Sequence, residues 1–309
     1  MLIGHFTIHA GLRAIIYSCH MVAFVFLSGY FYNSSRKFSD SLKKMVKSFL
    51  GPYLVFVVCA LLLNRNQWSI PWLKGELIKY LLGFSFAKNV LPGMASVGPV
   101  YFVLLLFAVR LLYMVIDKTV PNEFWKWSVT LLVSVFGVYL GQCGCWLPWS
   151  LDVALYCVIF YKLGLFFRQK KIVEYVKNHY PVYFLLSPVW AYMIYAGGME
   201  IAIRNYGQYG LVVIGSVTGI LTIWIFADYI AGHTQGVRAM LNELGKDSIY
   251  LIIIHTLLND WICDRVSLRF HPEHFTCMIL VILIQSLMAV GIRYAISFAR
   301  ILDIPVLKE

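Results

Sequence analysis

The sequence predicts an all-α protein, a polytopic integral membrane helical bundle with about nine complete transmembrane helices and an N-terminal stump. Three observations lead to this fold class. Hydrophobic residues make up 60% of the 309 residues, whereas they make up about half of a soluble protein. Charged residues make up only 13%, whereas a soluble protein has about a quarter. The apolar residues fall in long runs, and Lys and Arg fall between these runs. We therefore expect residues 1–309 to form a single membrane domain.

The predicted spans follow one another along most of the chain. A transmembrane helix needs about 17 to 25 mostly apolar residues. Nine stretches meet or approach this length: 14–32, 48–63, 97–116, 127–141, 150–167, 180–197, 208–231, 247–263 and 275–291. Residues 76–87 are too few and too charged to cross a bilayer, so they are expected to form an interfacial or re-entrant piece in a long loop.

The placement of Lys and Arg predicts how the chain is oriented, because cytoplasmic loops carry an excess of both. If the segment after 14–32 is cytoplasmic, the cytoplasmic segments hold 16 basic residues and the opposite segments hold 8. The C-terminus is then cytoplasmic, and 14–32 enters the membrane from outside. The net charge of +11 is accounted for by topology, and no nucleic-acid partner is expected.

The N-terminal stretch 1–13 does not fit this pattern, since it would begin outside with nothing to carry it across the membrane. Two explanations are open. The N-terminus is translocated, or a first span has been lost and residues 1–5 are its remnant.

No motif typical of soluble enzymes is present: the chain has no GxSxG, no HExxH, no phosphate loop and no dinucleotide fingerprint. The candidates for chemistry are polar residues in or beside the bilayer, where they are costly. His5 lies at the outer edge and is either an unpaired surface histidine or part of a site. No cluster of His and Cys points to a metal ion.

Two predicted spans contain a histidine. His20, Phe24 and Ser28 share one helical face, because they follow at intervals of four residues. For His20, a hydrogen bond between helices and a catalytic role are equally open, and Ser28 with Gly29 is also typical of close helix packing. His255, near the centre of 247–263, is either a buried structural residue or part of a site.

A basic segment follows the first full span directly. It contains Arg36, Lys37, Lys43, Lys44 and Lys47. The positive-inside rule and attraction to anionic lipid explain such a cluster. Basic side chains at the cytoplasmic face could equally pair with the phosphates of a polyphosphate ligand.

The order of these residues resembles a known family. "GH" followed by "IYSCHMVAFVFLSGYFY" is similar to the opening of the acyltransferase 3 family of integral membrane acyltransferases, in its fucose 4-O-acetylase-like branch. The resemblance continues through "GPYLVF", "GPVYFVLLLFAVRLL" and "LPWSLDVALYCVIFYKLGLFFR" to "LNELGKDSIYLIIIHTLL". It covers nearly the whole chain and implies that most of the family's first helix is missing here.

The resemblance implies an enzyme of the cytoplasmic (inner) membrane that moves an acyl group, acetyl above all, from acyl-CoA to a hydroxyl of a cell-envelope glycan or lipid-linked sugar. It implies that His5 is the catalytic base or acyl carrier, with His20 beside it. Ser28 and His255 are expected to bind the acceptor, and the basic segment of Arg36, Lys37, Lys43, Lys44 and Lys47 to hold the phosphates of acetyl-CoA. Histidine suits such chemistry because it ionises near neutrality.

Two other functions remain open. A transporter or flippase for a glycan or small solute also needs polar residues within the membrane, although repeat symmetry and matching broken helices are not evident here. The absent first helix would also fit an inactive, truncated homologue of the acyltransferases.

Overall fold

The computed structural model describes residues 10–85, 95–246, 248–267 and 275–301. This part of the chain is nearly all helical (84%), and no strand occurs in it, which confirms the all-α fold class. Helices occupy most of each of the nine predicted ranges. Six of these helices are long and apolar enough to cross a membrane, so the chain is a multi-pass membrane protein: Gly11–Tyr30, Phe38–Leu63, Gly98–Thr119, Glu123–Gln142, Pro148–Gln169 and Tyr209–His233.

The predicted count of nine spans is not confirmed. Helix α11 (Tyr180–Tyr195) has only 16 residues. Helices α14 (Ser248–Ser267) and α15 (Phe275–Ile301) have 20 and 27 residues, and their described residues include the apolar stretches Ser248–Leu258 and Ile279–Ile292.

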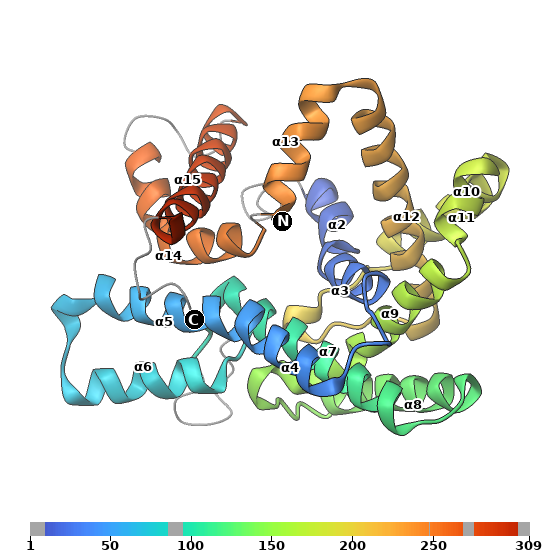
Figure 1. The fold of residues 1–309 in the computed structure, drawn as a ribbon, viewed down its shortest axis with the longest axis horizontal. Helices are drawn as coiled ribbons and strands as arrows, with labels where there is room; N and C mark the ends of the chain where they lie inside the picture. The colour runs from blue at the N-terminus through green and yellow to red at the C-terminus, as the bar shows by residue number, and fades with distance from the viewer. Residues whose placement is uncertain (1–9, 86–94, 247, 268–274, 302–309) are drawn as a thin grey trace.

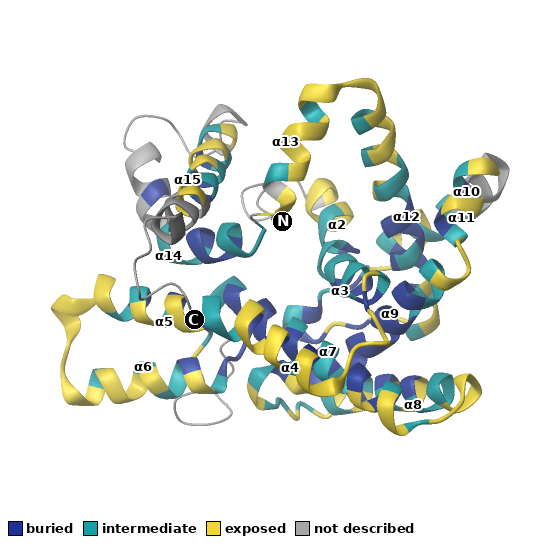
Figure 2. Ribbon diagram, in the orientation of Figure 1, coloured by how far each residue is buried: buried dark blue, intermediate teal, exposed yellow. Residues whose placement is uncertain are grey.

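Helix α9 (Leu151–Gln169) lies at the centre of the bundle. It packs against α3 (His20–Tyr30), α7 (Tyr101–Thr119) and α8 (Glu123–Gln142). Figure 2 shows the buried residues gathered where α3, α7 and α9 meet. Most of α9 is buried because it is apolar or aromatic on nearly every face, as expected for a helix surrounded by other helices.

Two glycines allow α3 and α9 to approach closely. A Cβ on Gly29 of α3 would overlap the carbonyl oxygen of Tyr161, and a Cβ on Gly164 of α9 would overlap the carbonyl oxygen of Phe26. Small residues at such crossings let two backbones touch, which is a main source of helix association in membranes. The predicted packing role of the Ser28–Gly29 pair is therefore confirmed at Gly29.

A π-helical turn interrupts the second span. Helix α4 (Phe38–Met45) continues through η1 (Val46–Leu50) into α5 (Gly51–Leu63). Pro52 stands in the first turn of α5 and has no N–H to donate to the preceding turn. A widened turn before a proline relieves this mismatch without ending the helix.

Helix α6 (Ile70–Leu82) covers most of the predicted short segment 76–87. Ser69 caps its first turn by accepting a hydrogen bond from the Trp72 N–H, and Gly83 ends it at a φ of +61°. With 13 residues it extends about 20 Å, which is less than the hydrocarbon core of a bilayer.

The remaining helices form pairs around this centre, as Figure 1 shows. Helix α10 (Ile172–Asn178) leads into α11, which packs against α12 (Tyr209–His233), and α13 (Gln235–Lys246) joins α12 to the α14–α15 pair. The outer faces of several helices carry exposed apolar side chains, among them Leu54, Val58 and Leu62 on α5 and Leu132, Val135 and Phe136 on α8. In a membrane protein these faces contact lipid.

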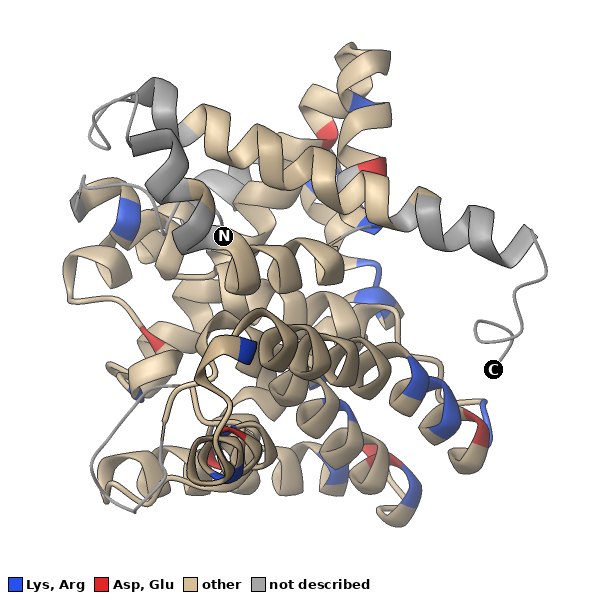
Figure 3. Cartoon of the chain, turned by 90° about the vertical axis from the view of Figure 1, so that its left-hand side faces the viewer, with Lys and Arg blue, Asp and Glu red and all other residues tan. Residues whose placement is uncertain are grey.

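The two ends of the bundle differ in charge. At the end that we name the basic end, the segment 31–37 meets the end of α7, where the Lys118 Nζ donates to the Ser34 carbonyl oxygen over 2.7 Å. Figure 3 shows Lys and Arg concentrated toward one side, on the right in that view. At the opposite end, Ser85, Asp152 and Arg204 come together.

Candidate functional site

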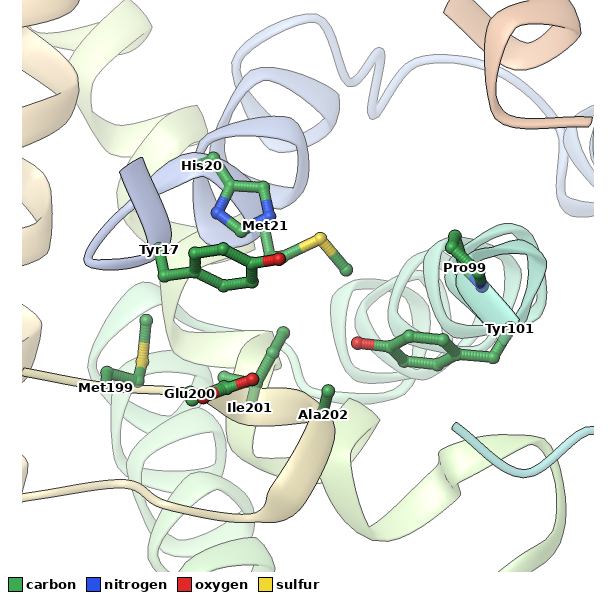
Figure 4. A pocket seen from close by; sticks show the side chains of 9 residues that line it. All are labelled: Tyr17, His20, Met21, Pro99, Tyr101, Met199, Glu200, Ile201 and Ala202. Carbon is green, nitrogen blue, oxygen red and sulfur yellow. The ribbon is translucent and has the colours of Figure 1, made fainter. Parts of the chain in front are cut away.

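A small cavity lies at this opposite end, where the first residues of α3 and α7 meet the turn around η5 (Ile201–Ile203). Its volume is about 60 Å³, and it is lined by Tyr17, His20, Met21, Pro99, Tyr101, Met199, Glu200, Ile201 and Ala202 (Figure 4). Such a volume has room for a small group of atoms.

His20 is held in a defined orientation by its own helix. Its Nδ1 lies 2.9 Å from the carbonyl oxygen of Ile16. Because a carbonyl oxygen only accepts, Nδ1 is assigned the proton, and Nε2 is the nitrogen with the lone pair in the neutral ring. The ring of Tyr17 meets the imidazole edge-on at a centroid distance of 4.9 Å. The Ile16 carbonyl and the Tyr17 ring therefore fix the orientation of the His20 imidazole.

Two further polar groups reach the cavity from other elements. Tyr101 is only 4% exposed, and its hydroxyl oxygen has no hydrogen-bond partner among the described residues. Figure 4 shows this hydroxyl pointing toward the middle of the lining side chains, with the carboxylate of Glu200 on the far side below Tyr17. An imidazole, a carboxylate and two phenols thus stand around a mainly apolar wall.

A buried ion pair fixes the wall that carries Glu200. Arg204 and Asp152 form a bidentate pair, with Nε to Oδ2 at 2.8 Å and Nη2 to Oδ1 at 3.2 Å, and their side chains are 2% and 0% exposed. Arg204 also donates to the Ser85 hydroxyl and the Ala202 carbonyl oxygen. Its guanidinium lies 3.6 Å from the ring centroid of Trp146.

The turn itself is under backbone strain. Arg204 has a φ of +60°, a region that residues other than glycine rarely adopt. Strain of this kind persists only where the surroundings hold it, and here Asp152, Ser85 and the paired backbone of Glu200 and Asn205 do so. The lining residues Glu200 to Ala202 are therefore rigidly placed.

The site residues predicted from the sequence are not brought together. His20 lines the cavity, whereas Ser28 lies two turns further along α3 and His255 is buried in α14, with Nδ1 3.3 Å from Gln285 Oε1. Neither Ser28 nor His255 is a lining residue. His5, the predicted catalytic base, lies outside the described residues.

The predicted phosphate-binding residues lie on another part of the molecule. Arg36, Lys37, Lys43, Lys44 and Lys47 are all exposed, on the segment before α4 and on α4 and η1. Behind them, Asp117 accepts from the Tyr32 hydroxyl at 3.0 Å and pairs with Lys126 at 2.7 Å. Burial and the nearby Asp117 carboxylate raise the pKa of Tyr32, so its hydroxyl stays protonated and donates.

Several residues of the cavity end were missed by sequence reasoning, namely Tyr17, Tyr101, Glu200 and Arg204. The sequence does contain one signal for the ion pair. Asp152 and Arg204 carry opposite charges, both are predicted on the outer side of the membrane, and the chain has few charged residues. Asp152 also accepts a hydrogen bond from the Leu147 N–H at 3.1 Å.

Within the ranges that the structure describes, no group of three or more His, Cys, Asp or Glu side chains could hold a metal ion. Comparison of the chain with protein families, characterised proteins and solved structures finds no match.

Proposed function

We propose that this chain is a membrane-bound O-acyltransferase of the cytoplasmic membrane. It moves an acetyl group from acetyl-CoA to a hydroxyl of a cell-envelope glycan or its lipid-linked precursor. The observation that supports this most is the placing of His20 against a small, mainly apolar cavity together with Tyr101 and Glu200. The motif order in the sequence, from "GH" to the histidine of α14, supports the same activity.

The proposed chemistry needs one proton acceptor. The acceptor hydroxyl oxygen attacks the thioester carbonyl carbon, a C–O bond forms, the C–S bond breaks, and coenzyme A leaves as a thiolate. The hydroxyl proton passes to a histidine and from there to the thiolate. General-base assistance of this kind contributes about 10² to 10⁴ in rate.

We assign this proton transfer to His20, which lines the cavity and whose Nδ1 proton is held by the Ile16 carbonyl oxygen. The turn on the opposite wall supplies the Glu200 carboxylate as a further polar group. His5 remains a prediction from the sequence as base or acyl carrier.

The donor's phosphates are assigned to the basic end. The exposed Arg36, Lys37, Lys43, Lys44 and Lys47 offer charge for them on the cytoplasmic side. Helix α3 has 11 residues and therefore rises about 16 Å between this end and the cavity. An elongated thioester, with its phosphates far from its acyl group, fits this separation.

The test is a comparison of envelope glycans, by mass, from cells with and without the chain. We expect each glycan repeat to lose the mass of one acetyl group when the chain is absent. Glycans of unchanged mass but in reduced amount at the cell surface would contradict acyl transfer and favour a transporter or flippase. Glycans unchanged in both respects would favour an inactive homologue.

A further inference from the structure

The hydroxyl of Tyr101 is buried beside the cavity and has nothing in the described structure to bond to. The ring is 4% exposed, and the hydroxyl oxygen has no hydrogen-bond partner among the described residues. A buried donor without a partner is unfavourable, and folded proteins leave few such groups. A polar atom of a ligand in the cavity would relieve it.

The position of this hydroxyl is set by elements that cannot easily move. Tyr101 begins α7, directly after the turn η3 (Gly98–Val100), and its neighbours Val100, Phe102 and Val103 are all buried. Gly98 has a φ of +68°, and a Cβ added to it would lie 3.2 Å from the Thr256 side chain of α14. The packing of α14 on this turn leaves the tyrosine ring little freedom.

The size and lining of the cavity restrict the kind of ligand group that the Tyr101 hydroxyl can bind. Met21, Met199, Ile201 and Ala202 supply apolar surface, and the volume is about 60 Å³. A methyl group next to a carbonyl fits this combination, because the methyl contacts the apolar wall while the oxygen accepts a hydrogen bond. A long acyl chain would exceed the space.

We propose that the Tyr101 hydroxyl binds the carbonyl oxygen of a short acyl group, acetyl above all, and stabilises that oxygen as it becomes negative during transfer. This inference rests on the proposed acyltransferase activity. When the acceptor oxygen attacks, the π electrons of the thioester carbonyl move to its oxygen, toward which Tyr101 donates. They return as the C–S bond breaks, and Tyr101 keeps its own proton throughout. A preorganised donor at such a position is worth about 10² to 10³ in kcat.

If the Tyr101 hydroxyl served only to stabilise the fold, its removal would lower the thermal stability. Removal of an unpartnered buried hydroxyl does not weaken the fold and tends to strengthen it. Loss of activity together with unchanged or raised thermal stability is therefore a signature that a packing residue would not give.

The experiment measures acetyl transfer from acetyl-CoA by the full chain in lipid nanodiscs, with the Tyr101→Phe variant. We expect kcat to fall by about 10² or more, the KM for acetyl-CoA to change little, and the melting temperature to stay equal or rise. The matched control is Tyr113→Phe, on the same helix, because that hydroxyl is also buried without a partner in the described chain and does not line the cavity. The control should retain full activity.

Each outcome decides between the two claims. If the unchanged chain and Tyr101→Phe transfer acetyl at equal rates, the proposed role of Tyr101 is wrong and the proposed function stands. No transfer by the unchanged chain overturns both. A second arm compares acetyl-CoA with octanoyl-CoA, where a rate for octanoyl transfer as high as for acetyl transfer would contradict the size restriction.

Discussion

Arg204 and Asp152 differ from the surface ion pairs of this protein in how completely they are buried. Their side chains are 2% and 0% exposed, whereas those of Lys177 and Asp228 are 31% and 57% exposed at the similar distance of 2.7 Å. Removal of one partner of a buried pair leaves a charge that neither water nor a counter-ion neutralises. The same removal at the surface leaves a hydrated charge.

We therefore expect Arg204→Met to destabilise the folded chain by about 3 to 5 kcal/mol, because the Asp152 carboxylate loses its partner. Lys177→Met should change the stability by about 0 to 1 kcal/mol. Denaturant unfolding in detergent micelles measures both free energies. Equal, small effects of the two substitutions would show that the pair does not hold the turn around Glu200.

The residues of the candidate site were predictable only where the helix pattern shows them. His20 could be singled out because a histidine stands out in an apolar run. Tyr101 and Tyr17 could not, since the chain has 20 tyrosines and nothing local marks those two. Their importance arises from long-range packing, which brings residues 17, 101 and 200 to one cavity.

At the scale of helices, the contact of α3 with α9 depends on two glycines. Gly29 and Gly164 each face a backbone carbonyl of the other helix so closely that a methyl group would overlap it. Gly232, near the end of α12, has open space around the position of a Cβ. The two kinds of helical glycine should therefore respond oppositely to alanine.

We expect Gly164→Ala to destabilise the chain by about 1 to 3 kcal/mol, because α3 and α9 must move apart. Gly232→Ala should leave the stability unchanged or raise it by up to about 1 kcal/mol, through the better helix propensity of alanine. Melting temperatures of the two variants in the same detergent are the measurement. A stabilised Gly164→Ala variant would refute the close crossing.

The basic segment around α4 gives a prediction on donor binding. The double variant Lys43→Gln, Lys44→Gln should raise the KM for acetyl-CoA several-fold with little change in kcat, because both side chains are exposed and act by charge alone. Added salt should shrink the difference from the unchanged chain. The control is Lys170→Gln, Lys171→Gln, which removes the same charge from another exposed turn. Equal KM values for the two double variants would contradict a specific phosphate site.

The helices themselves were largely predictable, because apolar runs between charged segments are direct consequences of a bilayer. The predictions were weaker where length decides, because the apolar pattern predicts a span over 180–197 whereas α11 has only 16 residues. The π-helical turn before Pro52 was not predicted, because periodicity does not reveal a single widened turn. Such turns depend on what the neighbouring helices permit.

At the scale of the whole molecule, the charge asymmetry predicts that the basic end faces the cytoplasm and the cavity end faces outward. Two exposed cysteines, Cys143 and Cys145, follow α8 at the cavity end and serve as native reporters. Ser35 lies exposed in the segment between α3 and α4 and can be replaced by cysteine as a reporter for the basic end.

We expect a membrane-impermeant thiol reagent to modify Cys143 and Cys145 in intact spheroplasts. The Cys143→Ser, Cys145→Ser variant provides the background from the other cysteines. Addition of Ser35→Cys to that variant should give modification only after the membrane is permeabilised. The reverse pattern would invert the orientation and place the basic segment outside, away from cytoplasmic acetyl-CoA.

The central claim is that the cavity beside His20 carries out acyl transfer, and one comparison tests it most directly. His179 has the same hydrogen bond as His20, with Nδ1 2.9 Å from the carbonyl oxygen four residues earlier, and a tyrosine ring stacks on it. It is exposed and does not line the cavity. The measurement is the acetyl content of envelope glycans, by mass, in cells that make equal membrane amounts of the unchanged chain, His20→Ala or His179→Ala. The account predicts acetylated glycans with the unchanged chain and with His179→Ala, and their loss with His20→Ala. Glycans fully acetylated with His20→Ala would contradict it.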